Sequence, residues 1–116
     1  MSKFEINGVE LEFDIYDADT YDAYEKSVEE VKKISEKANN TETQKHFSTY
    51  IREFSSAVKK HYDEIFGDGT GEKVCSEKDS LVIASKAFTA LAREVARQGE
   101  ALKANSLLTD ISGEIK

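Results

Sequence analysis

The stretch "EIFGDGTGEKVC" (residues 64–75) decides which class of fold the sequence encodes. It holds three glycines at alternate positions, together with an Asp, a Thr and a Lys. Loops that bind phosphate or calcium have this composition, and so do bends that end one helix and direct the next. The segment is therefore either a ligand-binding loop or a helix–helix connection.

No ligand motif matches this stretch. A P-loop ends in Gly-Lys-Ser/Thr after a strand, whereas Glu72 here separates the last glycine from Lys73. A dinucleotide fingerprint fails because no βαβ unit surrounds the segment. A calcium loop beginning at Asp68 would need Gly in place of Lys73, and usually Glu in place of Asp79. Gly67 follows the last apolar residue of a periodic segment, where a helix C-cap favours Gly. We therefore interpret the segment as a connection between two helices.

Apolar residues at helical spacing lie on both sides of this connection. Residues 42–66 are predicted to form one long helix that opens with a capping box of Thr41 and Gln44. Residues 79–98 are predicted to form the last helix, and residues 20–38 an earlier one with a weaker apolar stripe. The strongest stripe in the chain consists of Phe47, Ile51, Phe54, Val58, Tyr62 and Ile65.

Residues 3–15, "KFEINGVELEFDI", predict a β-hairpin. The dipeptide Asn7-Gly8 is a strong hairpin signal, because a type I′ turn needs positive φ at both of its central residues. Period-two alternation then places the apolar side chains on one face, which must pack against another element because an isolated hairpin is marginally stable. The predicted cross-strand pairs are Lys3 with Glu12, Phe4 with Leu11, Glu5 with Glu10 and Ile6 with Val9.

These elements predict a single domain over residues 1–116, of class α+β and mostly α. The expected architecture is an N-terminal β-hairpin packed on a three-helix bundle. Residues 99–116 form a polar tail whose apolar residues keep helical spacing. The sequence therefore leaves open whether this tail folds back on the bundle.

Composition excludes several function classes. No apolar run approaches the roughly 20 residues that span a bilayer, and the N-terminus lacks the apolar stretch of a signal peptide. The single Cys cannot form an internal disulfide, which fits a reducing cytoplasm. The net charge is −7 and no basic block exists, so we expect neither membrane association nor direct nucleic-acid binding.

The candidate chemical groups do not form a recognisable active site. The acidic cluster Asp14, Asp17, Asp19 and Asp22 fits the start of a helix better than a calcium loop. His61 lies at the apolar edge of its helix, where a partly buried, hydrogen-bonded histidine is the expected role. Nothing in the sequence indicates that the Cys75 thiol is activated. We therefore expect no catalytic, cofactor-binding or metal-binding residues, and no enzyme activity.

The last predicted helix carries more apolar residues than one face needs. By helical geometry these extra residues lie nearly opposite the main stripe, as a strip of small side chains on which another helix could pack. The alternative is that the C-terminal tail covers this strip, while the free hairpin edges offer a route to homo-oligomers. The candidate partner-binding residues are Ile83, Ala87 and Ala90 in the helix, and Leu107, Leu108 and Ile111 in the tail.

Three parts of the sequence resemble small tail-module proteins of tailed phages and prophages of Gram-positive bacteria. The first is the strand, Asn-Gly, strand pattern, and the second is Asp-x-x-Thr at residues 17–20 before a Tyr/Glu/Lys-rich helix. The third is the Phe-Gly-x-Gly-Thr-x-Glu-Lys segment at residues 66–73. The resemblance covers roughly residues 3–95.

The resemblance implies a non-catalytic tail assembly chaperone or adaptor that acts in the cytoplasm of the bacterial host. Its expected partner is an amphipathic helical protein such as the tape-measure protein, or the tail-tube protein. Two alternatives remain: an acidic regulator that occupies the basic surface of a host nucleic-acid-binding protein, and a structural component of the virion.

Overall fold

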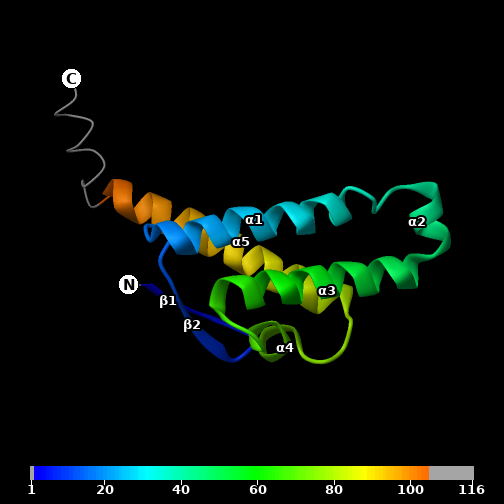
Figure 1. The fold of residues 1–116 in the computed structure, drawn as a ribbon, viewed down its shortest axis with the longest axis horizontal. Coiled ribbons are helices and arrows are strands. Elements are labelled where there is room, and N and C mark those ends of the chain that lie inside the picture. Colours follow the sequence, from blue (N-terminus) through cyan, green and yellow to red (C-terminus); the bar gives the residue numbers. More distant parts are fainter. Residues whose placement is uncertain (1, 105–116) are drawn as a thin grey trace, which may run out of the picture.

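The structure is a computed structural model that describes residues 2–104 (Figure 1). This part of the chain folds as a two-stranded antiparallel hairpin followed by helices, so the predicted α+β, mostly α class is confirmed. The elements are β1 (Ser2–Ile6), β2 (Val9–Phe13), α1 (Ala18–Ser35), α2 (Thr41–Lys45), α3 (Phe47–Phe66), α4 (Thr70–Cys75) and α5 (Leu81–Ala104).

The hairpin has the predicted register, and all four expected cross-strand pairs form. Asn7 and Gly8 have φ values of 51° and 80°, as a type I′ turn requires. The Asn7 side-chain amide also donates a 2.6 Å hydrogen bond to the carbonyl of Val74 in α4. The hairpin tip is thereby joined to a segment 67 residues later in the chain.

The three long helices enclose the core. Figure 1 shows α1 and α3 running side by side in opposite directions, with α5 crossing behind both. The hairpin and α4 cover the lower part of the bundle in the same view, and β1 and α4 both contact α5. The buried apolar core consists of Phe13, Val31, Tyr50, Phe54, Val58, Tyr62, Val74, Cys75, Ala84, Ala87 and Leu91.

The prediction of a single helix over residues 42–66 is wrong, because the helix is interrupted at His46. This residue has φ −126° and ψ 49°, which is outside the helical region. Its backbone N–H donates to the carbonyl of Thr43, and its own carbonyl accepts the first hydrogen bond of α3 from Thr49. The break lets α2 turn the chain from the end of α1 into the start of α3, as Figure 1 shows.

The predicted capping box of Thr41 and Gln44 is also wrong. Asn40 is the N-cap of α2, and its side chain accepts a 2.9 Å hydrogen bond from the N–H of Glu42. The Gln44 side chain instead donates to the carbonyl of Ala38 in the preceding turn. Asn at this position satisfies a free helical N–H as well as Thr does, so pattern alone could not rank the two residues.

The other helix bounds differ from the prediction by a few residues. Asp17 is the N-cap of α1, and its carboxylate accepts 2.9 Å hydrogen bonds from the backbone N–H and the hydroxyl of Thr20. These bonds lower the pKa of Asp17. The last helix begins at Leu81, not at residue 79, and it continues through Gly99 to Ala104 instead of ending at residue 98.

The glycine-rich segment is a connection between helices, as predicted, and it contains the short helix α4. Gly67 and Gly69 have φ values of 112° and 90°, which L side chains rarely adopt. Gly71 is needed for a different reason, since a Cβ there would lie 2.2 Å from the carbonyl oxygen of Lys59. Its N–H donates a 2.7 Å hydrogen bond to the carboxylate of Asp63. The three glycines therefore direct the turn and let α4 pack against α3.

Candidate partner-binding surface

The predicted strip on the last helix is not exposed as a unit. Ala87 has no exposed surface, and its carbonyl accepts a 2.7 Å hydrogen bond from the buried hydroxyl of Tyr62. Ile83 and Ala90 are half-buried. The prediction of a single free strip is therefore wrong, because α5 packs against α3, α4 and β1 and so buries more than one of its faces.

Ile83 and Ala90 nevertheless each line a hollow where the hairpin tip meets α5. The larger hollow has a volume of about 440 Å³, and we call it the hairpin–α5 groove. Its lining residues are Ile6, Ser85, Lys86, Thr89, Ala90 and Arg93. The smaller hollow measures about 190 Å³ and is lined by Asn7, Lys73, Val74, Cys75, Ser76 and Ile83.

The hairpin–α5 groove combines apolar and small side chains with two cations. Lys86 and Arg93 are exposed, and neither forms an ion pair with another residue in the described range 2–104. Val82 lies one turn before Lys86 and is 65% exposed, the most exposed large apolar side chain among residues 3–100. Two unpaired cations beside exposed apolar surface are notable in a chain whose net charge is −7.

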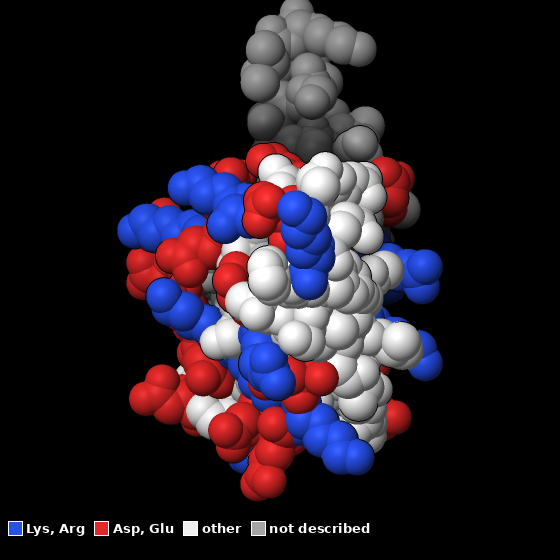
Figure 2. All heavy atoms as spheres, turned by 90° about the vertical axis from the view of Figure 1, so that its right-hand side faces the viewer, with Lys and Arg blue, Asp and Glu red and all other residues white. Residues whose placement is uncertain are grey.

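Charged side chains are unevenly distributed over the molecular surface. Figure 2 shows the end of the molecule that carries α2, with charged side chains gathered on one side and a largely uncharged surface on the other. The uncharged side is the one turned away from the viewer in Figure 1, where α5 crosses behind α1 and α3. The molecule thus has a less charged side, and α5 lies on it.

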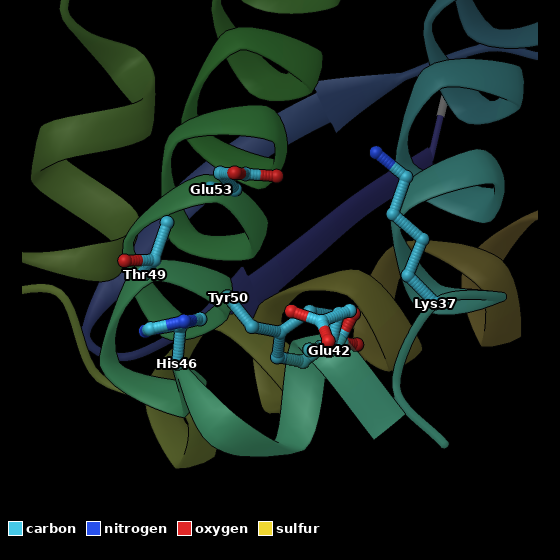
Figure 3. Close-up of a pocket in the computed structure, with 7 residues that line it drawn as sticks. Lys37, Glu42, His46, Thr49, Tyr50 and Glu53 are labelled. Carbon is cyan, nitrogen blue, oxygen red and sulfur yellow. The ribbon is translucent and has the colours of Figure 1, made fainter. Parts of the chain in front are cut away.

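A third hollow, of about 230 Å³, lies where α2 joins α3 (Figure 3). Lys37 approaches it from the turn after α1, and the other labelled residues come from α2 and the start of α3. Glu42 already pairs with Lys45 at 3.4 Å, and His46 is exposed at the helix break. The lining residues are Lys37, Glu42, Thr43, His46, Thr49, Tyr50 and Glu53. These mixed charges favour an ordinary solvated surface over a binding site for one class of ligand.

His61 is hydrogen-bonded, as predicted, but it is fully buried where partial burial was expected. Its Nδ1 lies 2.5 Å from the hydroxyl oxygen of Ser27, which also lies 2.7 Å from the carbonyl oxygen of Ala23. His61 Nε2 has no hydrogen-bond partner within residues 2–104, and the rings of Tyr24 and Phe88 lie beside it. Burial lowers the pKa of His61 to about 4, so the imidazole is neutral at pH 7.

Cys75 is buried at the edge of the smaller hollow, at the end of α4. Burial is the main cause that raises the pKa of the Cys75 thiol to about 11. Only the thiolate is a strong nucleophile, so this environment disfavours reaction. The structure places Cys75 beside Asn7 and Val74, whereas His61 lies in the core against α1 and α5.

Three of the four acidic residues near the start of α1 have separate structural partners. Asp14 accepts a hydrogen bond from the N–H of Tyr16, Asp17 caps α1, and Asp22 pairs with Lys26 at 3.0 Å. Within residues 2–104 no three His, Cys, Asp or Glu side chains converge in a way that could hold a metal ion.

A family model described as "Family of unknown function (DUF6673)" matches residues 7–110. The chain belongs to this family. The match begins at the hairpin turn and includes every helix of the structure, so the glycine-rich connection and the α5 side of the groove both lie inside it. No curated protein and no solved structure matches the chain. Among the helices that the structure describes, none is both long enough and apolar enough to cross a membrane.

The cations of the groove were not among the predicted partner-binding residues. Lys86 and Arg93 are seven residues apart, and this two-turn spacing was a signal in the sequence that they share one helix face. The contribution of Ile6 could not be read in this way, because only the tertiary structure brings β1 against α5. The tail residues Leu107, Leu108 and Ile111 lie outside the described residues.

Proposed function

We propose that this member of the family is a non-catalytic adaptor that binds an amphipathic helix of another protein in the hairpin–α5 groove. One observation supports this role above the others: the unpaired Lys86 and Arg93 border the apolar side chains of Ile6 and Ala90. A helix laid in a groove buries an apolar stripe while its polar flanks meet the charged rim. The exposed Val82 extends the apolar surface by one helical turn.

The resemblance to phage tail-module proteins gives the adaptor a biological setting. In this proposal the protein is a tail assembly chaperone in the cytoplasm of the bacterial host. Its partner is the tape-measure protein, whose long helix needs an apolar cover until the tail tube forms around it. Many copies bound along one helix would hold it through multivalency even if each contact were weak. Leu107, Leu108 and Ile111, which lie outside the described residues, stay further candidates for contact with the partner.

Co-expression with a tape-measure protein from the same genome tests the proposal. We expect the pair to co-purify, and we expect the tape-measure protein to be more soluble than when it is expressed alone. Thr89→Trp would place a large uncharged side chain in the groove and should abolish co-purification. Thr49→Trp is the matched control, because it makes the same change at an exposed position of α3.

One result would contradict the chaperone role, and another would contradict only the assignment of the groove. A tape-measure protein that stays equally insoluble and forms no complex would exclude it. Equal effects of the two Thr→Trp variants would exclude the groove as the binding surface. Mass spectrometry of purified phage particles distinguishes a chaperone from a structural component of the virion. A structural component would be retained in the particle, whereas a chaperone would not.

A further inference from the structure

We infer that the helix bound in the hairpin–α5 groove is acidic, with carboxylates two turns apart along one edge of its apolar stripe. This inference rests on the proposed function and specifies its partner. It comes from the placement of Lys86 and Arg93 on one face of α5, both exposed and both without an ion pair in the described part of the chain.

The spacing of the two cations sets the spacing of the carboxylates. Residues 86 and 93 are seven apart, which is close to two helical turns and about 10.5 Å along the axis. A helix packed nearly parallel or antiparallel to α5 presents residues i and i+7 with the same separation. Acidic residues at that spacing would face Lys86 and Arg93 together, whereas a basic helix would place like charges opposite one another.

The other residues of the groove fit a helix as the occupant. Ser85, Thr89 and Ala90 are small, so the backbone of a second helix could approach α5 closely. Ile6 supplies an apolar side wall from the hairpin. Lys73, at the neighbouring hollow, is exposed and also has no ion pair within residues 2–104. The cationic character therefore extends along the hairpin side of α5, although the chain as a whole is acidic.

Two synthetic helical peptides can test this inference on the full chain by fluorescence anisotropy. Both peptides carry the same leucine stripe. They differ only at one position of the seven-residue repeat, which is Glu in every repeat of the acidic probe and Lys in every repeat of the basic probe. At low salt we expect the acidic probe to bind at least about tenfold more tightly than the basic probe. The preference should weaken as salt is added.

The charge-reversed double variant, Lys86→Glu with Arg93→Glu, should prefer the basic probe. The matched control is Lys33→Glu with Lys78→Glu, which changes the net charge equally at exposed positions outside the groove. This control should keep the preference for the acidic probe. Circular dichroism and thermal unfolding of each variant check that the fold is intact.

The outcomes separate the inference from the proposed function. Three results would exclude the acidic partner while helix binding stands. Both probes bind with no preference for the acidic one, or the preference for the acidic probe survives charge reversal in the groove. In the third, that preference is lost equally in the control variant. If neither probe binds to any form of the protein, helix binding is contradicted, and the inference that rests on it also fails.

Discussion

The side chain of Gln98 is hydrogen-bonded to the backbone of Phe13, 85 residues earlier in the chain. Its amide nitrogen donates a 2.6 Å bond to the Phe13 carbonyl, and its amide oxygen accepts a 3.0 Å bond from the N–H of Ile15. The hydroxyl of Tyr16 donates to the backbone carbonyl of Gln98 itself. The end of the hairpin is thus fixed to the C-terminal half of α5. The Gln98 amide also donates to the carboxylate of Glu94, which pairs with Arg97 at 2.6 Å.

Replacing Gln98 should destabilise the whole domain. Gln98→Ala leaves the buried carbonyl of Phe13 and the N–H of Ile15 without partners, which costs about 2–4 kcal/mol of unfolding free energy. Urea unfolding followed by circular dichroism measures this loss. Gln44→Ala is the control, because Gln44 is exposed and makes one side-chain hydrogen bond, to the turn after α1. This substitution should cost less than about 1 kcal/mol. Equal losses in the two variants would show that the hairpin is not held by Gln98.

The same substitution at two helical glycines should have opposite effects. Gly71→Ala places a methyl group 2.2 Å from the carbonyl oxygen of Lys59, so α4 must move away from α3. We expect a loss of about 2–3 kcal/mol in unfolding free energy. Gly99→Ala meets no atom within 4 Å and lies inside α5. It should stabilise the protein by about 0.5–1 kcal/mol, because Ala favours the helix more than Gly does.

The unfolding of Gly71→Ala tests whether α4 packs closely against α3. If Gly71→Ala unfolds at the same urea concentration as the original chain, α4 does not pack against Lys59. Both variants add the same methyl group, so the change in unfolding free energy of Gly71→Ala can be compared directly with that of Gly99→Ala.

Stability should fall between pH 7 and pH 5 because of His61. Burial lowers the pKa of His61 to about 4 in the folded state, below the ordinary value of 6.5 that applies when the chain is unfolded. Between these values the unfolded chain binds a proton that the folded chain does not, so acidification favours unfolding. The stabilisation is present above pH 6.5 and is lost as the pH falls towards 4, by about 2 kcal/mol from pH 7 to pH 5.

Urea unfolding at several pH values checks this dependence. The pKa of Glu94 and that of Asp17 are both lowered, Glu94 chiefly by its hydrogen bond to Arg97 and Asp17 chiefly by its bond to Thr20. The stabilisation that these two carboxylates give is lost only when the pH falls below their ordinary pKa values. It therefore does not account for the change in stability between pH 5 and pH 7. His61→Gln should remove the slope in this interval, whereas His46→Gln should retain it. A slope that persists in His61→Gln would assign it to another group.

Cys75 should react slowly with thiol reagents in the folded protein. Because burial raises its pKa to about 11, from an ordinary value of 9.0, the thiolate fraction is roughly a hundredfold lower than that of a free cysteine. Labelling with a chromogenic disulfide should therefore be at least about a hundredfold slower in buffer than in urea. Val82→Cys in a Cys75→Ser background is the control, since position 82 is exposed and should label fast in both solvents. Rapid native labelling of Cys75 would contradict its burial.

Local sequence rules were enough to predict the hairpin and to predict that the glycine-rich segment connects two helices. Asn7 and Gly8 specify a turn through their own backbone preferences, and that turn fixes the register of the strands. The glycines at positions 67 and 69 adopt φ values that other residues avoid. These features depend on residues that are neighbours in the chain, so a single sequence contains the information.

Features that depend on distant residues were decided only by the tertiary structure. Ala87 is buried because α5 has neighbours on more than one face, which helical periodicity cannot reveal. The partners of Gln98 and the apolar wall that Ile6 gives the groove come from the opposite end of the chain. Periodicity shows which residues share a helix face, but only packing determines which faces are covered, because burial requires a second element whose position no local pattern encodes.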